Sequence, residues 1–294
     1  MSASAGMQGL AFTPPALALE LVGPSKRPFK LSRLVGPVVV FVLFIATWYF
    51  MHYWGLRWIF DKNGERLIPL PTDVWDATVM SKITRDDYID GIGWTAVAAY
   101  GGLLITIVLG LLLAVIMLQA RWVEGAIYPY LVALQAIPVL AIVPIIYVVF
   151  GGSMSARLFV CVMISFFPIV TNALFGMKSV DRSQHDLFTL RSSSRWTRLV
   201  KLQLPSALPN IFTGFRISAG LSIIGAVVGE QFFRGGSKPG VGIVIEKWRT
   251  KGTYAPLWGG IIIACLMGII TFLVFGVIQK LVVGKWHDGE TQKD

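Results

Sequence analysis

Six apolar runs, each long enough to cross a lipid bilayer, constrain the fold of this chain more than any other feature. A transmembrane helix needs about 20 apolar residues, because it rises about 1.5 Å per residue through a hydrocarbon core about 30 Å thick. The runs cover residues 34–54, 92–118, 123–150, 157–177, 208–233 and 256–283. Backbone groups in lipid must be hydrogen-bonded internally. The pattern therefore predicts an all-α membrane protein with six transmembrane helices.

Composition places the chain in the same class. Hydrophobic residues make up 55% of the 294 residues and charged residues only 14%, whereas a soluble domain carries about 25% charged residues. The formal net charge of +10 would suggest nucleic acid in a soluble protein. Here the basic residues gather beside apolar runs, where they orient a membrane protein. We expect no nucleic-acid partner.

The chain carries no recognisable catalytic or metal-binding pattern. It lacks the G-x-x-x-x-G-K-[ST] loop that cradles nucleotide phosphates. His52, His185 and His287 are scattered along the chain. Cys161 and Cys265 lie within apolar runs, which favours two buried small residues over a disulfide or a metal site. We expect a non-catalytic protein that itself binds no metal or cofactor.

Basic residues predict that both termini are cytoplasmic. Six spans put the termini on one side, and that side also receives Arg121, the segment 178–201 and Lys280. Cytoplasmic loops are enriched in Lys and Arg, so we assign this side to the cytoplasm. The residues that run against the rule are Lys238, Lys247, Arg249 and Lys251.

This topology divides the chain into a cytoplasmic tail, 1–33, a transmembrane domain, 34–285, and a second cytoplasmic tail, 286–294. Its outer loops cover 55–91 and 234–255, and the second one is expected to contain a short helix at 241–251. A signal peptide is the alternative for the first run. That run ends in Trp48, Tyr49, Tyr53 and Trp54, and such aromatic belts mark a membrane interface, so we expect an uncleaved span.

The most polar interval between two spans, residues 181–216, predicts two short amphipathic helices at a sharp bend. Ser183, three residues before Asp186, is typical of a capping box that opens the first helix. Pro205 is expected to stop the second helix, and Pro209 to lie in the first turn of the next one.

The second of these helices has one largely apolar face. Ser193 or Ser194 offers its N-cap. The face is formed, at helical spacing, by Trp196, Leu199, Val200 and Gln203. Arg195 and Arg198 project elsewhere. Such a helix suits a groove in another protein, and the alternative is a helix lying on the lipid surface with its arginines on headgroups.

Three separated passages carry a family resemblance. The motif E-A-A, three residues, Gly, nine residues, I-x-L-P corresponds to 186–188, Ser192 and 202–205, with bulkier residues at the Ala-Ala pair and Ser192 at the Gly. Residues 134–152 and 166–181 supply the other two passages. The chain resembles, over most of its length, the inner-membrane permeases of binding-protein-dependent ABC importers, in the group that includes nitrate, sulfonate, taurine and pyrimidine-precursor permeases.

The resemblance implies a type I ABC importer permease fold and a set of partners. These are two ABC ATPase subunits, which would hold ATP and Mg, an extracytoplasmic binding protein, and a second permease copy in a homodimer. A small polar solute or anion would be the cargo. The segment 181–205 would be the coupling loop that meets the ATPase, through Asp186, Ser192, Arg195, Trp196, Arg198, Leu199, Leu204 and Pro205. Trp196 and Leu199 would be buried anchors, and Arg195 and Arg198 rim contacts.

Polar residues inside apolar runs are candidates for the translocation pathway, because each needs a partner or water. They are Gln135, Ser165, Asn172, Ser218, Ser222 and Glu230. Ser218 and Ser222 could instead bond carbonyls of their own helix. Glu230 lies about 30 Å along its helix from Pro209, and the family has a Glu here at the outer mouth. The alternative is an interfacial carboxylate exposed to water.

Prolines within the runs predict broken helices, at Pro138 and Pro144 in one run and at Pro168 in the next. Two other functions remain open from the residues alone: an ion-coupled secondary transporter acting without an ATPase, and a membrane scaffold. The secondary transporter would need charged or proton-relay residues near mid-membrane, and the sequence shows no clear set.

Overall fold

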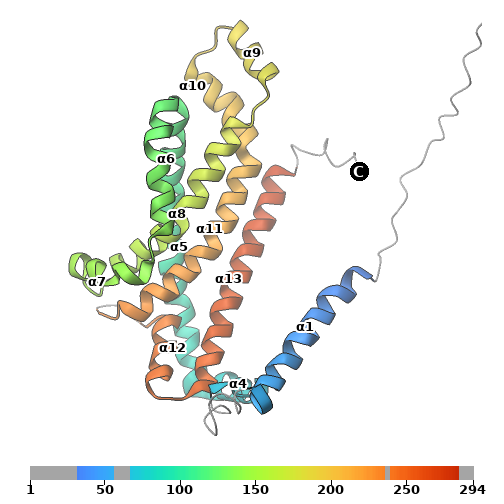
Figure 1. Ribbon diagram of the computed structural model, residues 1–294, viewed down its shortest axis with the longest axis vertical. Helices are drawn as coiled ribbons and strands as arrows, with labels where there is room; N and C mark the ends of the chain where they lie inside the picture. Colours follow the sequence, from blue (N-terminus) through green and yellow to red (C-terminus); the bar gives the residue numbers. More distant parts are fainter. Residues whose placement is uncertain (1–31, 56–66, 236–238, 285–294) are drawn as a thin grey trace, which may run out of the picture. The chain divides into compact units, whose positions relative to one another are not determined.

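A computed structural model describes residues 32–55, 67–235 and 239–284, and every regular element within these ranges is helical (Figure 1). The predicted tail 286–294, and all but the last two residues of the tail 1–33, lie outside the described residues. Five of the described helices are long and apolar enough to span a membrane, or six if one bent pair is counted as a span. The all-α membrane class is confirmed.

The first helix, α1 (Ser32–Phe50), continues into a π turn at Met51–Gly55. The described residues up to Trp48 belong to a separate unit from the one that begins at Tyr49. From Val35 to Trp54 every side chain is exposed or only partly buried, as expected for a helix whose surface is covered by lipid.

Four long helices form the body of the second unit: α5 (Lys82–Gln119), α8 (Met154–Lys178), α11 (Leu204–Phe232) and α13 (Tyr254–Val283). Helix α8 packs on both α5 and α11, and α13 packs on α11. Close approach depends on missing side chains, because Cβ atoms added at Gly102 and Gly225 would lie 2.4 Å from Cys161 Cβ and 2.8 Å from Cys161 Cα. Small residues at such seams let membrane helices approach closely.

The third predicted span is not one straight helix. It is divided into α6 (Arg121–Ala136) and α7 (Val139–Phe150), which meet at an angle of 99°. The break falls where Pro138 forces Ile137 into an extended conformation, with φ −67° and ψ 121°, because the proline ring disfavours the helical region for the preceding residue.

The other two predicted breaks are wrong. Pro144 lies inside α7 and Pro168 lies inside α8, and each helix continues through its proline. Membrane helices tolerate an internal proline where neighbouring groups satisfy the freed backbone atoms.

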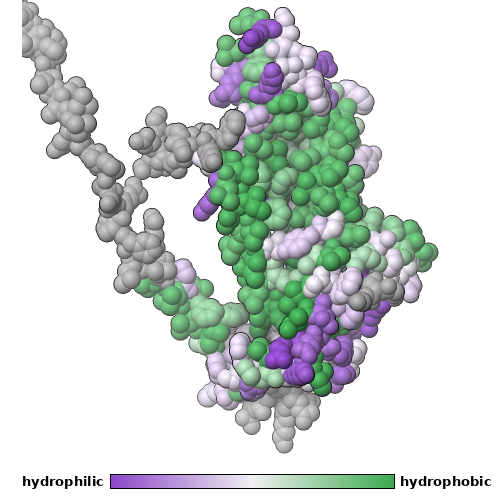
Figure 2. Space-filling view, turned by 180° about the vertical axis from the view of Figure 1, so that it is seen from behind, coloured by the Kyte–Doolittle hydropathy of each residue, from purple (hydrophilic) through white to green (hydrophobic). Residues whose placement is uncertain are grey.

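The two ends of this unit carry different short helices (Figure 1). Helices α9 (Arg182–Leu190) and α10 (Arg195–Arg198) lie at one end, and α4 (Pro71–Trp75) and α12 (Val241–Thr250) lie at the other. The helix expected at 241–251 is present as α12. Part of the loop expected at 55–91 is helical instead, since α5 begins at Lys82. Figure 2 shows apolar side chains over the middle of the unit and polar side chains gathered at its two ends.

Candidate functional site

The bend between α9 and α10 is built by local hydrogen bonds. Helix α9 has Asp181 at its N-cap position, without a side-chain cap bond, so the capping box expected at Ser183 is wrong. The second cap is confirmed, because the Thr197 backbone N–H donates to Ser194 Oγ at 3.1 Å. Arg198 Nη2 also donates to Thr189 Oγ1 at 3.3 Å. The cap and this bond together fix the angle between the two short helices.

Ser192 adopts a backbone conformation that favours glycine. Its φ is +49°, which makes it the single described non-glycine residue with positive φ in the chain. For an L-residue this left-handed conformation costs roughly 1–2 kcal/mol. Ser192 occupies the motif position where the resembling permeases have Gly, so the strain accounts for that glycine and supports the placement of the motif.

Pro205 does not stop the second helix. A π turn at Leu199–Gln203 follows α10 directly and leads into α11, where the Leu204 N–H bonds to Leu199 O. Pro205 therefore follows the π turn directly and lies within a continuous helical segment, where the widened turn accommodates a residue without an N–H. Pro209 lies inside α11 rather than in its first turn. The outcome is one helical segment, Arg195–Phe232, of 38 residues.

The predicted coupling residues differ in exposure. Trp196 on α10 is 71% exposed, and Leu187 and Leu190 on α9 are 66% and 84% exposed; these three exposed apolar side chains are called the apolar patch below. Asp186 and Arg195 are exposed as well. Leu199 is 2% exposed and packs in the protein's own core beside Leu174 and Met177. Leu199 therefore presents no surface to a partner in this conformation, contrary to the anchor role expected for it.

A cavity of about 350 Å³ separates α9 from the beginning of α11. Its walls are formed by Gln184, Leu187, Phe188, Lys201, Leu202, Pro205 and Ser206. Leu204 is partly buried and packs against the core beneath it. The cavity leaves α9 held to the bundle mainly through its ends.

Three of the predicted pathway residues hold helices together. Ser218 Oγ donates to Ser165 O at 2.7 Å, and Ser222 Oγ donates to Ala99 O at 2.6 Å. The alternative that both serines bond carbonyls of their own helix is therefore wrong. Ser165 bonds Cys161 O at 2.7 Å and lies 3.0 Å from Thr106 Oγ1. All three serines are buried.

The other polar candidates do not join this set. Gln135 is exposed on α6. Asn172 is partly buried and donates to Pro168 O of its own helix at 2.8 Å. Within the described chain the six predicted residues therefore do not converge on one cavity.

Glu230 is fully buried, so the alternative of a water-exposed interfacial carboxylate is wrong. Thr95 Oγ1 lies 2.9 Å from both carboxylate oxygens and donates to the carboxylate. The Gly242 backbone N–H donates to Glu230 Oε2 at 2.8 Å, and the Val241 N–H donates to Thr95 Oγ1 at 2.8 Å. The end of α11 is thereby joined to α5 and to the first turn of α12.

The residues around Glu230 were not found from the sequence. Arg157 on α8 is fully buried, its Nε donates to Phe233 O at 3.0 Å, and its charge interacts with Glu230. Two glycines make room for the carboxylate: a Cβ at Gly240 would lie 2.0 Å from Glu230 Oε1, and one at Gly242 would lie 2.3 Å from Val227 O. Two features of the sequence could have indicated these residues: Arg157 stands at the edge of an apolar run, and Gly240 and Gly242 flank Val241.

Two of the basic residues that run against the positive-inside rule, Lys247 and Arg249, are paired with acids. Lys247 Nζ lies 2.5 Å from Asp87 Oδ2. Arg249 and Arg234 both bond Glu246, the latter at 2.8 Å. The hydrogen bonds from Arg249, followed by those from Arg234, lower the pKa of Glu246 despite its burial. Three basic side chains at this end of the unit therefore share two carboxylates.

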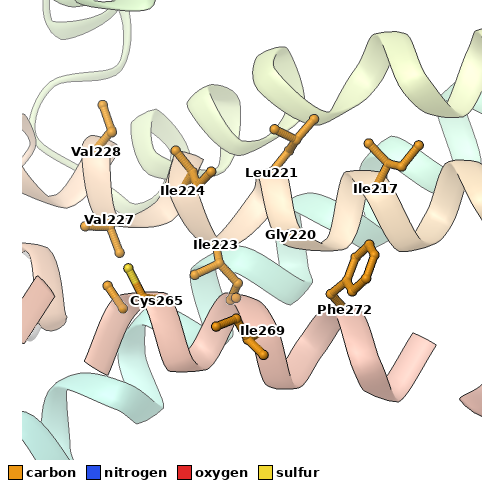
Figure 3. Close-up of a pocket in the computed structure, with 12 residues that line it drawn as sticks. Ile217, Gly220, Leu221, Ile223, Ile224, Val227, Val228, Cys265, Ile269 and Phe272 are labelled. Atoms are coloured by element: carbon orange, nitrogen blue, oxygen red, sulfur yellow. The ribbon is translucent and has the colours of Figure 1, made fainter. Parts of the chain in front are cut away.

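An apolar groove of about 610 Å³ lies between α11 and α13 (Figure 3). Ile223 of α11 and Ile269 of α13 face one another across it, and Phe272 points toward α11. Gly220 and Gly268 deepen it, since a Cβ at either would meet nothing within 4 Å. The lining offers no hydrogen bonds to a polar solute, so this groove suits lipid or another apolar helix.

Metal chemistry finds no support in the described part of the chain. No group of three or more His, Cys, Asp or Glu residues is placed to hold a metal ion there. Cys161 is buried and Cys265 is exposed, and neither is in a disulfide.

Relatives of the chain are transport permeases. It is 37% identical to the formylaminopyrimidine transport permease of Halalkalibacterium halodurans over 62% of this chain and 72% of the relative. It is 28% identical to an aliphatic sulfonates transport permease (putative in its name) of Bacillus subtilis, over 64% and 66% of the two chains. It is 26% identical to the nitrate import permease of Leptolyngbya laminosa, over 81% and 86%.

The family comparison agrees and does not support the ion-coupled secondary transporter. The model of the "Binding-protein-dependent transport system inner membrane component" family matches residues 106–286. This match covers α8, α11, α12 and α13 as well as the bend at α9 and α10. The chain belongs to this family and is a multi-pass membrane permease subunit of an ABC importer.

Proposed function

We propose that α9 and α10 are the surface through which ABC ATPase subunits drive this permease. The observation that carries the proposal is the exposed patch of Leu187, Leu190 and Trp196, placed at the end of one helical segment that continues to Phe232. A segment of 38 residues is about 57 Å long. A force on Trp196 therefore reaches the opposite end of the bundle without crossing a loop.

ATP and Mg belong to the ATPase subunits in this proposal. The chain has no phosphate-binding loop of its own, and its relatives are named as permeases only. Two ATPase subunits and two permease copies form the assembly in this proposal, as the resemblance to importer permeases implies. The permease domain comprises residues 34–285, with 181–205 as its coupling loop.

The coupling end faces the cytoplasm, together with both termini. The Lys178–Glu124 ion pair joins the end of α8 to the beginning of α6, so α6 with α7 supports a single crossing between α5 and α8. If the bent helices α6 and α7 are counted as one span, the chain crosses the membrane six times, and both termini lie on the same side. The basic residues at the coupling end, among them Lys178, Arg195, Arg198 and Lys201, support this orientation under the positive-inside rule.

The cargo is a small polar solute or anion handed over by an extracytoplasmic binding protein at the end that carries α12. Support comes from the relatives, whose names cover a formylated aminopyrimidine, sulfonates and nitrate. These compounds share small size and polarity. The binding protein rather than the permease carries the selectivity among them.

Co-purification with the ATPase tests the coupling surface. Trp196→Asp places a charge in the apolar patch and is expected to abolish the association, since central aromatic anchors dominate interface energies. Trp122→Asp is the matched control, because Trp122 is equally open, at 77% against 71% exposed, and lies outside the patch on α6. A Trp196→Asp variant that binds the ATPase as well as the parent chain would show that the surface lies elsewhere.

The side of the membrane needs its own measurement. Arg195→Cys, with Cys265 replaced by Ser, should react with a membrane-impermeant maleimide only after the cytoplasmic face is opened. Labelling of intact cells at this position would contradict the proposed orientation.

A further inference from the structure

We propose that Glu230 is a positioning residue that fastens α12 to the outer ends of α5, α8 and α11, so that these elements move as one body during transport. The inference rests on the proposed function in one respect, that α11 is driven from its coupling end. In this proposal the outer mouth is rigid, and α12 does not move away from the helices of its own permease copy.

The fastening uses the first turn of α12. N–H groups at the beginning of a helix have no partner within the helix, and Gly240 at the N-cap position has no side chain to supply one. The Val241 N–H finds Thr95 Oγ1 on α5, and the Gly242 N–H finds Glu230 Oε2 on α11, both at 2.8 Å. Two other helices thus provide the cap, and the carboxylate lies at the positive end of the α12 dipole.

Packing leaves this cap no freedom to shift. The Cβ positions of Gly240 and Gly242 are already occupied by the Glu230 carboxylate and by Val227 O. On the α5 side, a Cβ at Gly91 would lie 3.1 Å from the Val241 nitrogen. The backbone of α12 therefore touches both α5 and α11 directly, and a small rotation of α12 would break bonds on both sides.

Burial favours the closed arrangement as well. The side chains of Glu230, Thr95 and Arg157 are all fully buried. Separating α12 would remove the Gly242 N–H from the carboxylate without offering water in exchange. Buried charges are stable only when they are paired and hydrogen-bonded, so α12 is retained while the bundle tilts. The mouth then opens between permease copies.

Hydrogen–deuterium exchange on the purified permease tests the fastening without any ATPase. Glu230→Gln keeps the size of the side chain but removes its charge, and it is expected to raise exchange of the α12 amides by about tenfold or more. Lys247→Met is the matched control, because it removes the ion pair with Asp87 between α12 and α5 at the surface, and it should leave α12 exchange within about twofold of the parent. Unchanged exchange in Glu230→Gln would overturn the proposal, whether or not the coupling surface is correct.

Cross-linking tests the joint movement in the chain that retains Glu230. Asp87→Cys and Lys247→Cys, with Cys265→Ser, are bridged by a short bis-methanethiosulfonate reagent in the complex with the ATPase. ATP hydrolysis stimulated by the binding protein should stay within about twofold of the unbridged complex. A loss of stimulation that a reductant restores would show that α12 must leave α5, which would refute the single-body movement. Failure of the ATPase to bind at all refutes the coupling surface instead, and the exchange experiment then decides the fastening alone.

Discussion

Two glycines on α11, five residues apart, should respond in opposite ways to a single methyl group. At Gly225 an added Cβ would lie 2.8 Å from Cys161 Cα and 3.3 Å from Val160 O, both backbone atoms of α8. At Gly220 it would meet nothing within 4 Å. Both positions are interior to the same helix, so Gly→Ala has the same effect on helix propensity at each.

The surroundings of the two glycines set the expected change in stability for each Gly→Ala variant. Ala is better than Gly in a helix interior by about 1 kcal/mol, so Gly220→Ala should stabilise by up to that amount. Overpacking against a backbone that cannot move aside costs about 1–3 kcal/mol, so Gly225→Ala should end between neutral and about 2 kcal/mol less stable. Propensity cancels in the difference between the two variants, and the remaining gap of about 1–3 kcal/mol measures the tightness of the α8–α11 seam.

The assay is reversible unfolding of the purified permease in mixed micelles by titration with dodecyl sulfate, followed by tryptophan fluorescence. Gly225→Ala should unfold at a lower dodecyl sulfate fraction than the parent or at the same one, and Gly220→Ala at a higher one. Equal free energies for the two variants, or the reverse order, would refute the close α8–α11 contact at Cys161.

Two further predictions concern the two ends of the bundle. Ser192→Gly should relieve the left-handed strain at φ +49°, and the roughly 0.5–1 kcal/mol that Gly costs in chain entropy offsets part of that gain. The free energy of unfolding should therefore rise slightly or stay unchanged, and ATPase binding should persist. Ser192→Val should lower both the free energy of unfolding and ATPase binding. Because Arg249 and Arg234 lower the pKa of Glu246 from its ordinary value of 4.5, its ion pairs contribute their full stability above that pH. That contribution is lost as the pH falls through the lowered pKa. The stability of α12, measured by amide exchange, should therefore fall at acid pH, and Glu246→Gln should reduce this pH dependence. An unchanged pH dependence in the variant would exclude the pairing.

The apolar runs predicted the order of the membrane-spanning helices, but the prolines did not predict where those helices bend. The bend at Pro138 could be expected, but Pro144 and Pro168 carry the same local signal without a break. At Pro205 the π turn shifts the hydrogen bonding by one residue, so that the proline needs no bond. A proline in the sequence shows only that one backbone N–H is missing. Whether the helix ends there depends on the surrounding packing.

The candidate sites show the same division. Trp196 and the Ser194 cap depend on short-range spacing, and the structure places them as expected. Leu199 was assigned to a partner surface and Glu230 had a water-exposed carboxylate as its alternative, but both side chains are buried in the bundle. Their burial depends on residues far along the chain, such as Thr95, 135 positions from Glu230. No local pattern encodes such a contact.

The pairing of outer cations with acids has a consequence for the rate of docking. Where Lys247, Arg249 and Arg234 share their charge with Asp87 and Glu246, the field above α12 is weak, and long-range attraction of a charged partner is correspondingly small. Arrival of a loaded carrier at this face should then depend little on ionic strength. Recognition there relies on shape and short-range contact after collision.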